Sequence, residues 1–203
     1  MFTGLIQEMG KVARVDHHGG YRRLWIGFDP DRGRLLLGGS IAVNGVCLTA
    51  TALEGRTFCA DLSGETQRCT TLGELQIGAA VNLERPVTAS DPLGGHIVLG
   101  HIDAVGQIRR VRRGNAGLEL FIQAPSQIMD YLVPKGSVAV DGVSLTVGLL
   151  ERKGFGVFLI PETAARTTLG AKGGAGAVNL EADYLAKLMK QFLERQQTGR
   201  IAP

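Results

Sequence analysis

The sequence has few aromatic residues, few cysteines and no long apolar run. Aromatic side chains make up 5% of the 203 residues, whereas glycine occurs 29 times. Short segments separated by glycine are typical of an all-β protein with tight turns. No apolar stretch approaches the roughly 20 residues that span a membrane, and residues 1–10 lack the basic start and apolar run of a signal peptide. We therefore expect a soluble, cytoplasmic protein that binds no membrane.

The cysteines and the charges exclude further classes of protein. Cys47, Cys59 and Cys69 are odd in number, form no Cys-x-x-Cys pair and all lie in the first half of the chain. This pattern argues against a disulfide framework and against a zinc site, so we expect no metal. Lys and Arg (22) exceed Asp and Glu (19) by only three, which is too small an excess to imply binding to nucleic acid.

The chain contains one module written twice. GSIAVNGVCLT at 39–49 returns as GSVAVDGVSLT at 136–146, an offset of 97 residues. Three further pairs of segments are related by offsets of 97 or 96 residues: 58–73 with 155–170, 80–84 with 177–181, and 4–12 with 100–108. Internal duplication predicts two similar units, each large enough for a modest core.

Each module alternates short apolar segments with turn signals. Asn44-Gly45 and Asp141-Gly142 are strong signals for two-residue hairpins. We predict a turn at 16–20 and a short helix or turn at 65–72. The alternation predicts strands at 4–15, 21–28, 40–43, 46–53, 58–62 and 81–85, and again at 97–111, 118–123, 137–140, 143–150, 155–160 and 178–181. About six strands per module favour a small closed barrel, because closure leaves no open sheet edge.

Two segments lie outside the repeat. Residues 89–95 read ASDPLGG, and a helical pattern begins at Asp183, its predicted N-cap, with Gly199 as the predicted stop. This helix could pack its apolar stripe on its own barrel or on copies of the helix from other chains. The stripe comprises Leu185, Leu188, Met189, Phe192 and Leu193. We therefore divide the chain into a first barrel at 1–88, a linker at 89–96, a second barrel at 97–182, and an oligomerisation helix with its tail at 183–203.

These motifs resemble those of riboflavin synthase of the alpha-chain type. The resemblance covers roughly residues 1–185 and rests on MFTGLIQEMG, VNGVCLT, ETxxxTTLG in both modules, GGHIVLGHID and DGVSLTV. It implies an all-β fold of two tandem six-stranded Greek-key barrels that bind lumazine, plus a C-terminal helix through which a homotrimer forms. The implied reaction is the dismutation of two 6,7-dimethyl-8-ribityllumazine molecules to riboflavin and 5-amino-6-ribitylaminouracil by four-carbon transfer. It implies no cofactor, and it leaves open an association with lumazine synthase.

Polar residues of the repeats are candidates for holding a ribityl chain, which needs short donors and acceptors. Taken singly, the same side chains could be ordinary strand surface or helix caps. Together with the resemblance, they give the following candidate substrate-binding residues: Gly4, Leu5, Ile6, Cys47, Leu48, Thr49, Asp61, Leu62, Ser63, Gly64, Glu65, Thr66, Gly100, His101, Ile102, Lys135, Ser144, Leu145, Thr146, Ile160, Pro161, Glu162, Thr163, Ala164 and Ala165.

The candidate catalytic residues are Phe2, Ser40, Cys47, His101 and Ser144. Cys47 aligns with Ser144, because 144 − 97 = 47, so the modules differ at one nucleophile. Its thiol could assist addition to the acceptor ring or proton movement, or it could be a small buried hydrophobe. His101 is a candidate for moving a proton from a substrate methyl group, because histidine is the residue type that most often exchanges protons near neutral pH. By resemblance, Phe2 packs over the bound heterocycle.

The remaining cysteines and histidines are expected to do no chemistry. Cys59 and Cys69 are interpreted as packing residues, and His17 and His18 are placed in a turn. His96, at the end of the linker, is interpreted as a packed or solvated side chain.

Two other functions stay open. A non-catalytic lumazine- or flavin-binding protein of the same fold is the main alternative. Such binders tend to degrade one copy of the site, whereas ETxxxTTLG is present twice here, together with Cys47, His101 and Ser144. A purely structural tandem barrel is the third class, and it predicts no affinity for a pteridine or a flavin.

Overall fold

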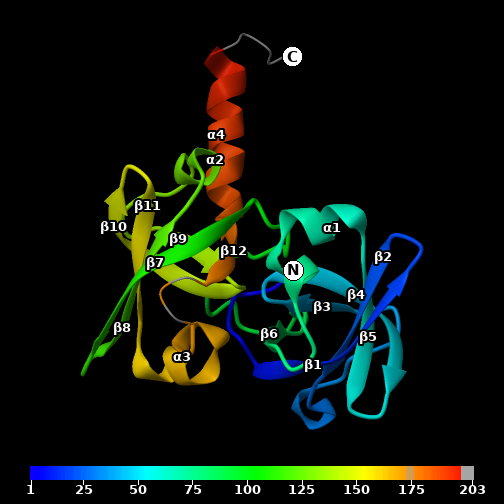
Figure 1. Cartoon of the computed structure of the whole chain (residues 1–203). Coiled ribbons are helices and arrows are strands. Elements are labelled where there is room, and N and C mark those ends of the chain that lie inside the picture. Colours follow the sequence, from blue (N-terminus) through cyan, green and yellow to red (C-terminus); the bar gives the residue numbers. More distant parts are fainter. Residues whose placement is uncertain (173, 175, 198–203) are drawn as a thin grey trace.

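The chain forms two β-barrels and a C-terminal helix in a computed structural model that describes residues 1–172, 174 and 176–197 (Figure 1). The strands of the first barrel are β1 (Glu8–His18), β2 (Tyr21–Gly27), β3 (Ser40–Val43), β4 (Val46–Glu54), β5 (Thr57–Leu62) and β6 (Ala80–Glu84). Those of the second are β7 (Ala104–Gly114), β8 (Gly117–Gln123), β9 (Ser137–Val140), β10 (Val143–Glu151), β11 (Gly154–Leu159) and β12 (Ala177–Ala182).

Both barrels have the same topology. The first closes in the order β1-β2-β5-β4-β3-β6, and the second, read from β7, closes as β7-β8-β11-β10-β9-β12. All neighbouring strands are antiparallel. The predicted pair of six-stranded barrels related by duplication is therefore confirmed.

Side-chain alternation explains why these segments form barrel strands. In β4, Val46, Leu48 and Ala50 are buried in the first core, while Cys47 and Thr49 between them face outward. The hairpin before β4 turns at Asn44, whose φ is +46°, and Gly45, whose φ is +79°. Two consecutive residues with positive φ match the twist of the flanking strands, as the Asn-Gly pair predicted.

The first strand of each barrel begins later than predicted. The predicted strand at 4–15 begins at Glu8, and the one at 97–111 begins at Ala104. The residues before them, 2–6 and 98–102, leave their own barrel and lie against the other one; we call them the crossing segments. They pair with each other through a bridge between Phe2 and Val98. Local alternation could not distinguish such a segment from a strand, because the mixture of apolar and polar residues continues without a break into the strand that follows.

The predicted turn at 16–20 is wrong in its extent. β1 continues to His18, so that His17 lies in the strand, and the turn consists of Gly19 and Gly20. Both glycines have positive φ, which makes a tight turn possible directly after His18.

The short helices repeat like the strands. α1 (Gly64–Cys69) and the 3-10 helix η2 (Thr71–Glu74) lie in the first module, and α3 (Pro161–Arg166) and η3 (Thr168–Gly170) match them in the second. The predicted helical segment at 65–72 is thus helical in two pieces. α2 (Ser126–Met129) and the 3-10 helix η1 (Pro30–Arg32) were not predicted.

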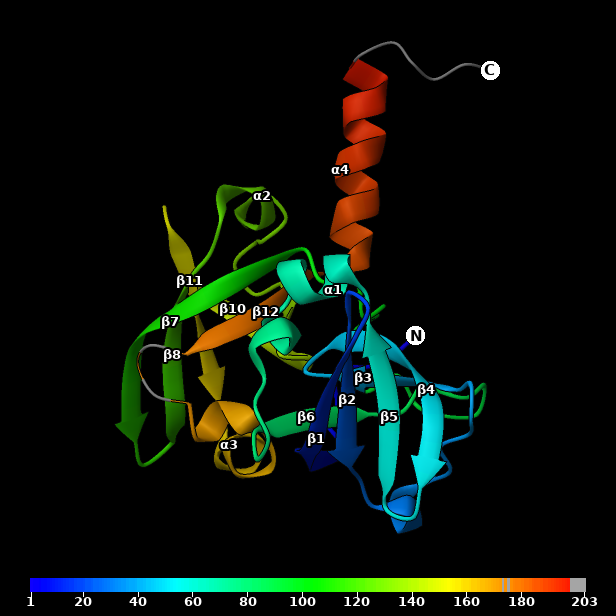
Figure 2. The same cartoon turned by 45° about the vertical axis from the view of Figure 1, so that its right-hand side comes forward.

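The C-terminal helix α4 (Tyr184–Gln197) projects away from both barrels (Figures 1 and 2). Asp183 Oδ1 accepts a hydrogen bond of 2.9 Å from the Leu185 backbone N–H, which confirms the predicted N-cap. The apolar stripe stays exposed within this chain: Met189 is 58% and Phe192 52% exposed. Gly199, the predicted stop, lies outside the described residues. None of the helices in the described part of the chain is long and apolar enough to cross a membrane.

A buried polar cluster joins the two barrels where their hairpin turns meet. Asn82 Nδ2 donates to the carbonyl of Asp141 at 2.9 Å, and Asn179 Nδ2 donates to the carbonyl of Asn44 at 2.9 Å. A Cβ added to Gly45 would lie 2.6 Å from the backbone N of Gly142, so only glycine permits this approach. Because buried polar groups need partners, these reciprocal bonds set how the two barrels meet.

Candidate functional site

Predicted polar residues share the outer face of β3 and β4. Ser40 is the cross-strand partner of Thr49, and Ala42 is the partner of Cys47. Directly opposed residues point to the same side of a sheet, so Ser40, Cys47 and Thr49 face outward together. In the second barrel, β9 and β10 repeat this arrangement with Ser144 and Thr146 on the outer face.

One crossing segment completes this face of the first barrel. The carbonyl of Gly100 accepts a 3.0 Å hydrogen bond from the Cys47 backbone N–H, and Ile102 packs against the first core. A Cβ on Gly100 would lie 2.5 Å from the Cβ of Cys47, so the backbones touch. His101, between these contacts, is exposed. The structure therefore brings His101 to the Cys47 face, although its own strand belongs to the second barrel. We call this site one.

The other crossing segment completes the equivalent face of the second barrel. The carbonyl of Gly4 accepts a 2.8 Å hydrogen bond from the Ser144 backbone N–H, and Ile6 packs against the second core. A cavity of about 220 Å³ lies here, lined by Gly4, Leu5, Ile6, Val143, Ser144, Glu162, Thr163, Arg166 and Thr167. Only Val143, Arg166 and Thr167 of this lining were not predicted. We call this site two.

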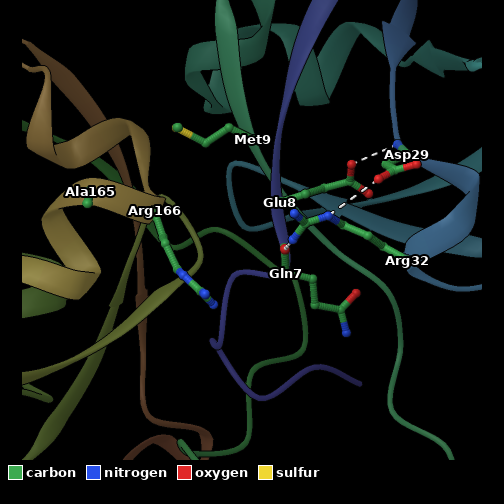
Figure 3. Close-up of a pocket in the computed structure, with 7 residues that line it drawn as sticks. All are labelled: Gln7, Glu8, Met9, Asp29, Arg32, Ala165 and Arg166. Carbon is green, nitrogen blue, oxygen red and sulfur yellow. Dashed lines mark hydrogen bonds and ion pairs between the residues drawn. The ribbon is translucent and has the colours of Figure 1, made fainter.

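Site two adjoins a larger groove between the barrels. Arg166 on α3 also lines two neighbouring cavities of about 540 and 400 Å³, both with Gln7 and Arg32. Figure 3 shows Arg166 extending from α3 toward Gln7, with Arg32 and Asp29 on the far side. The Arg166 guanidinium forms an ion pair of 2.6 Å with Glu162. A ligand in site two therefore has room to extend along this groove past the guanidinium.

Several predicted binding residues already have structural partners. Asp61 accepts two hydrogen bonds from Arg23, at 2.6 and 3.1 Å. The Ser63 hydroxyl caps α1 by accepting from the Thr66 backbone N–H at 3.1 Å. These contacts agree with the alternative interpretation of the sequence, in which such polar residues are helix caps or ordinary strand surface. Glu65 and Gly64 of α1 are exposed, and so is Lys135 in the turn before β9.

Other predicted residues point inward. The side chains of Leu48, Leu62 and Leu145 are buried in the two cores, so only their backbones are available to a ligand. The Phe2 ring is fully buried with Ala42, Val98 and Ala139, and Cys47 packs against this cluster. In this structure Phe2 therefore supports Cys47 from behind rather than lying on an open surface.

The α3 region carries the remaining predicted residues of the second module. Ile160 is the N-cap and Pro161 begins the helix, and both are exposed. Ala164 packs against the second core, while Ala165 faces the groove of Figure 3.

A histidine that the sequence reasoning set aside lies at site two. His96 is buried, and a hydrogen bond of 2.7 Å joins its Nδ1 to the Ser144 hydroxyl. Burial lowers the pKa of His96, against an opposing charge on Asp183, which favours the neutral imidazole. A neutral imidazole can accept the proton of a serine hydroxyl. Site one has a thiol and an exposed histidine, whereas site two has a hydroxyl and a buried one.

Comparisons with known proteins match both modules of the chain. The model of the lumazine binding domain matches residues 3–86 and 99–183. The riboflavin synthase of Actinobacillus pleuropneumoniae is 42% identical over 193 residues, which cover 95% of this chain and 90% of that protein. The riboflavin synthase of Escherichia coli (strain K12) is 37% identical over 203 residues, covering 98% and 95%. The chain belongs to the riboflavin synthase family.

Solved structures of LumP share the fold of this riboflavin synthase family member. The complex of LumP with riboflavin has a TM-score of 0.84 at 23% identity and covers 90% of this chain and 99% of the LumP chain. The complex with 6,7-dimethyl-8-(1'-D-ribityl)lumazine has a TM-score of 0.82 at the same identity and coverage. At this identity, the similarity establishes the fold alone.

The structure corrects one expectation about the cysteines of this family member. Cys59 is buried, as expected of a packing residue, but Cys69 is exposed at the end of α1. A six-residue helix is too short for its sequence pattern to show which side faces the core, so the sequence could not predict the exposure of Cys69.

Proposed function

We propose that the chain is a riboflavin synthase. It would convert two 6,7-dimethyl-8-ribityllumazine molecules to riboflavin and 5-amino-6-ribitylaminouracil by moving a four-carbon unit from one molecule to the other. The observation that carries this proposal is the pair of sites with equal architecture and unequal chemistry. A dismutation needs two copies of one substrate in different roles, and two related sites with different proton-transfer groups supply that difference. The protein's main contribution is then to hold two flat rings together in a reactive orientation.

The proposed units follow the repeat. We assign residues 1–88 and 97–182 to the two lumazine-binding barrels, with 89–96 between them. In site one, the Cys47 thiol assists addition or proton movement, and His101 moves a proton at the substrate. Ser40, Thr49 and the α1 region hold the ribityl chain. In site two, His96 orients Ser144 through the 2.7 Å hydrogen bond, and Thr146, Lys135 and the α3 region bind the ligand. Phe2 supports the position of Cys47 through the buried cluster against which Cys47 packs.

A ligand-binding protein without turnover is the second candidate, favoured by the LumP structures. LumP forms complexes with 6,7-dimethyl-8-(1'-D-ribityl)lumazine, riboflavin and flavin mononucleotide. A binder needs only one well-formed site. Here the crossing segment, the outward polar pair and the short helix are all present twice, which supports two ligands per chain.

Incubation of the purified chain with the lumazine substrate alone tests the proposal. We expect flavin absorbance to appear at neutral pH under reducing conditions, without any added cofactor. Cys47→Ser should slow turnover at least about tenfold, because a hydroxyl is far less acidic than a thiol. The variant should fold, since serine occupies the matching position in the second barrel. Cys69→Ser is the matched control, because Cys69 is exposed, and it should turn over at the wild-type rate.

Two outcomes would contradict parts of this proposal. If riboflavin binds but no flavin forms from the lumazine, the chain is a binder. If turnover is normal in Cys47→Ser, the thiol is a packing residue and the chemistry belongs to other groups.

We further propose that the protein is a cytoplasmic homotrimer assembled through α4. The three free cysteines support a reducing compartment. The exposed apolar stripe on α4 supports self-association, because a lone helix of this length is marginal without a partner surface. Whether a lumazine synthase also associates with it can be tested by co-sedimentation of the two proteins.

Truncation after Asp183 tests the role of α4 in assembly. We expect monomers by light scattering that still bind riboflavin weakly, because both barrels stay whole. Truncation also removes two ion pairs with the second barrel, Lys187 with Asp103 at 2.6 Å and Lys190 with Asp130 at 2.9 Å. A second variant, Met189→Ser with Phe192→Ser, keeps these pairs and should also be monomeric. A trimer in both cases would exclude α4 as the assembly element.

A further inference from the structure

Two buried glutamates, one in each barrel, hold the crossing segments. Glu84 at the end of β6 accepts hydrogen bonds from the Thr3 backbone N–H at 2.7 Å, the Thr3 hydroxyl at 2.8 Å and the Gly4 backbone N–H at 3.0 Å. Only 2% of Glu84 is exposed. Its carboxylate therefore binds the segment that belongs to the start of its own module.

Glu181 at the matching position of β12 does the same for the other segment. It accepts from the Leu99 backbone N–H at 2.8 Å and the Gly100 backbone N–H at 3.0 Å. It is 1% exposed. Gly4 and Gly100 both have positive φ, +77° and +84°, and this conformation turns two successive N–H groups toward one carboxylate.

In each crossing segment, the carbonyl of the glycine accepts a hydrogen bond from the opposite barrel. Gly4, whose N–H binds Glu84 of the first barrel, accepts from Ser144 of the second. Gly100, whose N–H binds Glu181 of the second barrel, accepts from Cys47 of the first. The path from each carboxylate thus runs through a single glycine residue, from its N–H to its carbonyl, to the site on the other barrel.

We propose that Glu84 and Glu181 are crossed positioning residues: Glu84 sets the geometry of site two, and Glu181 sets that of site one. This inference rests on the proposed function for the meaning of the two sites. Glu181 would keep the Gly100 carbonyl in place to accept from the Cys47 backbone N–H. The same contact would fix the position of His101, the next residue. Glu84 would keep the Gly4 carbonyl in place to accept from the Ser144 backbone N–H. The same contact would fix the positions of Leu5 and Ile6, which line the cavity of site two.

The chemistry of the carboxylates supports a positioning role. Hydrogen bonds from backbone N–H groups to an ionised acceptor are about twice as strong as neutral ones, and one carboxylate can accept from two N–H groups at once. A glutamine would offer one acceptor and place an NH₂ group against the second N–H. Burial raises the pKa of both groups, that of Glu181 to about 6. Each position thus keeps a buried acid, despite the cost of burial, where a glutamine would leave one backbone N–H without an acceptor.

Amide hydrogen exchange in the full-length protein tests the crossed assignment. Glu181→Gln should speed exchange of the Cys47 and Gly100 amides at least tenfold and leave Ser144 unchanged. Glu84→Gln should speed exchange of the Ser144 and Gly4 amides at least tenfold and leave Cys47 unchanged. Glu151→Gln is the matched control, because Glu151 lies on the surface paired with Arg110, and it should change neither.

The outcomes separate the assignment from a general structural role. Faster exchange within the glutamate's own barrel, equal acceleration in both barrels, or no change at Cys47 and Ser144 would each overturn it. If a glutamine variant does not fold, Glu84→Asp and Glu181→Asp keep the charge with a shorter reach. They should show the same crossed pattern with smaller amplitude, and its absence would equally overturn the assignment.

A riboflavin titration of the same variants links the assignment to ligand binding. Each glutamine variant should weaken the affinity of one of the two sites per chain, while the other keeps its wild-type value. This readout does not require turnover. If the crossed pattern holds but the wild type makes no flavin from lumazine, the proposed enzyme fails and the positioning role stands. If turnover is normal and the pattern is not crossed, only the positioning role fails.

Discussion

Two inactive chains should regain activity when they are unfolded and refolded together. One chain carries Cys47→Ala with His101→Ala, which disables site one. The other carries Ser144→Ala with Lys135→Ala, which disables site two. Each chain alone should be nearly inactive, because every reacting pair of ligands needs one intact copy of each site. In mixed trimers, an intact site one of the second chain can face an intact site two of the first.

The arrangement of one chain is the reason to expect that the reacting pair comes from two chains. α3 borders site two, and α1 is its counterpart in the first module. The two helices lie apart, with α1 above α3 in both views (Figures 1 and 2). The reacting atoms of the two ligands must approach to about 3 Å. We do not expect two ligands beside these separate helices of one chain to approach so closely. We therefore expect site one of each chain to face site two of a neighbour.

The size of the recovered activity is a further check. If three chains form a closed ring with one type of interface, an equal mixture places the required neighbours together in about a quarter of the interfaces. We therefore expect about a quarter of the wild-type rate, with mixed trimers verified by mass spectrometry. The control is a mixture of the two folded proteins without unfolding, which should stay inactive. Mixed trimers without activity would show that both sites of a reacting pair come from one chain.

The duplication made the fold predictable, but not the exchange of segments between the barrels. Strand alternation and the Asn44-Gly45 and Asp141-Gly142 turns are local signals, and twelve short strands followed from them. The crossing segments depend on contacts between residues nearly 100 positions apart, such as Gly100 with Cys47. Local periodicity contains no information about such contacts, so residues 97–103 were predicted as part of a strand.

The same limit applies to the candidate site. Cys47, Ser144 and the two ETxxxTTLG segments were found because the repeat aligns them, and the structure places each on the outer surface of its barrel or close to it. His101 was recognised but would have been grouped with its own module, whereas the Gly100 contact places it beside Cys47. His96 lies outside the aligned repeat, which begins at Gly100 in this region, so the duplication gave no signal for it. Its 2.7 Å bond to Ser144 is visible only in three dimensions.

The two barrels differ at one point of the polar cluster between them. Asn44 and Asp141 occupy matching turns with the same φ of +46°. Asn44 Oδ1 accepts from the Asn82 backbone N–H at 2.7 Å, and Asp141 Oδ1 accepts from the Asn179 backbone N–H at 2.8 Å. Asp141 is completely buried, and its other oxygen forms a 2.7 Å ion pair with Lys172. A buried carboxylate is thus balanced by one lysine.

Removal of that lysine should strongly destabilise the protein. We expect Lys172→Ala to lower the free energy of unfolding by about 3 kcal/mol at pH 7, because it leaves a buried charge unpaired. Burial raises the pKa of Asp141 even with Lys172 present. Ionised Asp141 therefore lowers the free energy of unfolding more as the pH rises through that pKa. The stability lost in Lys172→Ala should accordingly be smaller at acidic pH. Urea unfolding followed by circular dichroism at pH 7 and pH 4 measures both effects.

The double variant Asp141→Asn with Lys172→Ala should recover most of that stability at pH 7. Asn44 shows that asparagine makes the same turn and the same hydrogen bond in the first barrel, and the neutral amide leaves no charge to balance. Glu151→Ala is the control for an exposed pair, since Glu151 and Arg110 are 43% and 60% exposed. It should change stability by less than about 1 kcal/mol. A double variant as unstable as Lys172→Ala would mean that the lysine stabilises the loop through contacts other than Asp141, of which its bond to the Ala177 carbonyl is one.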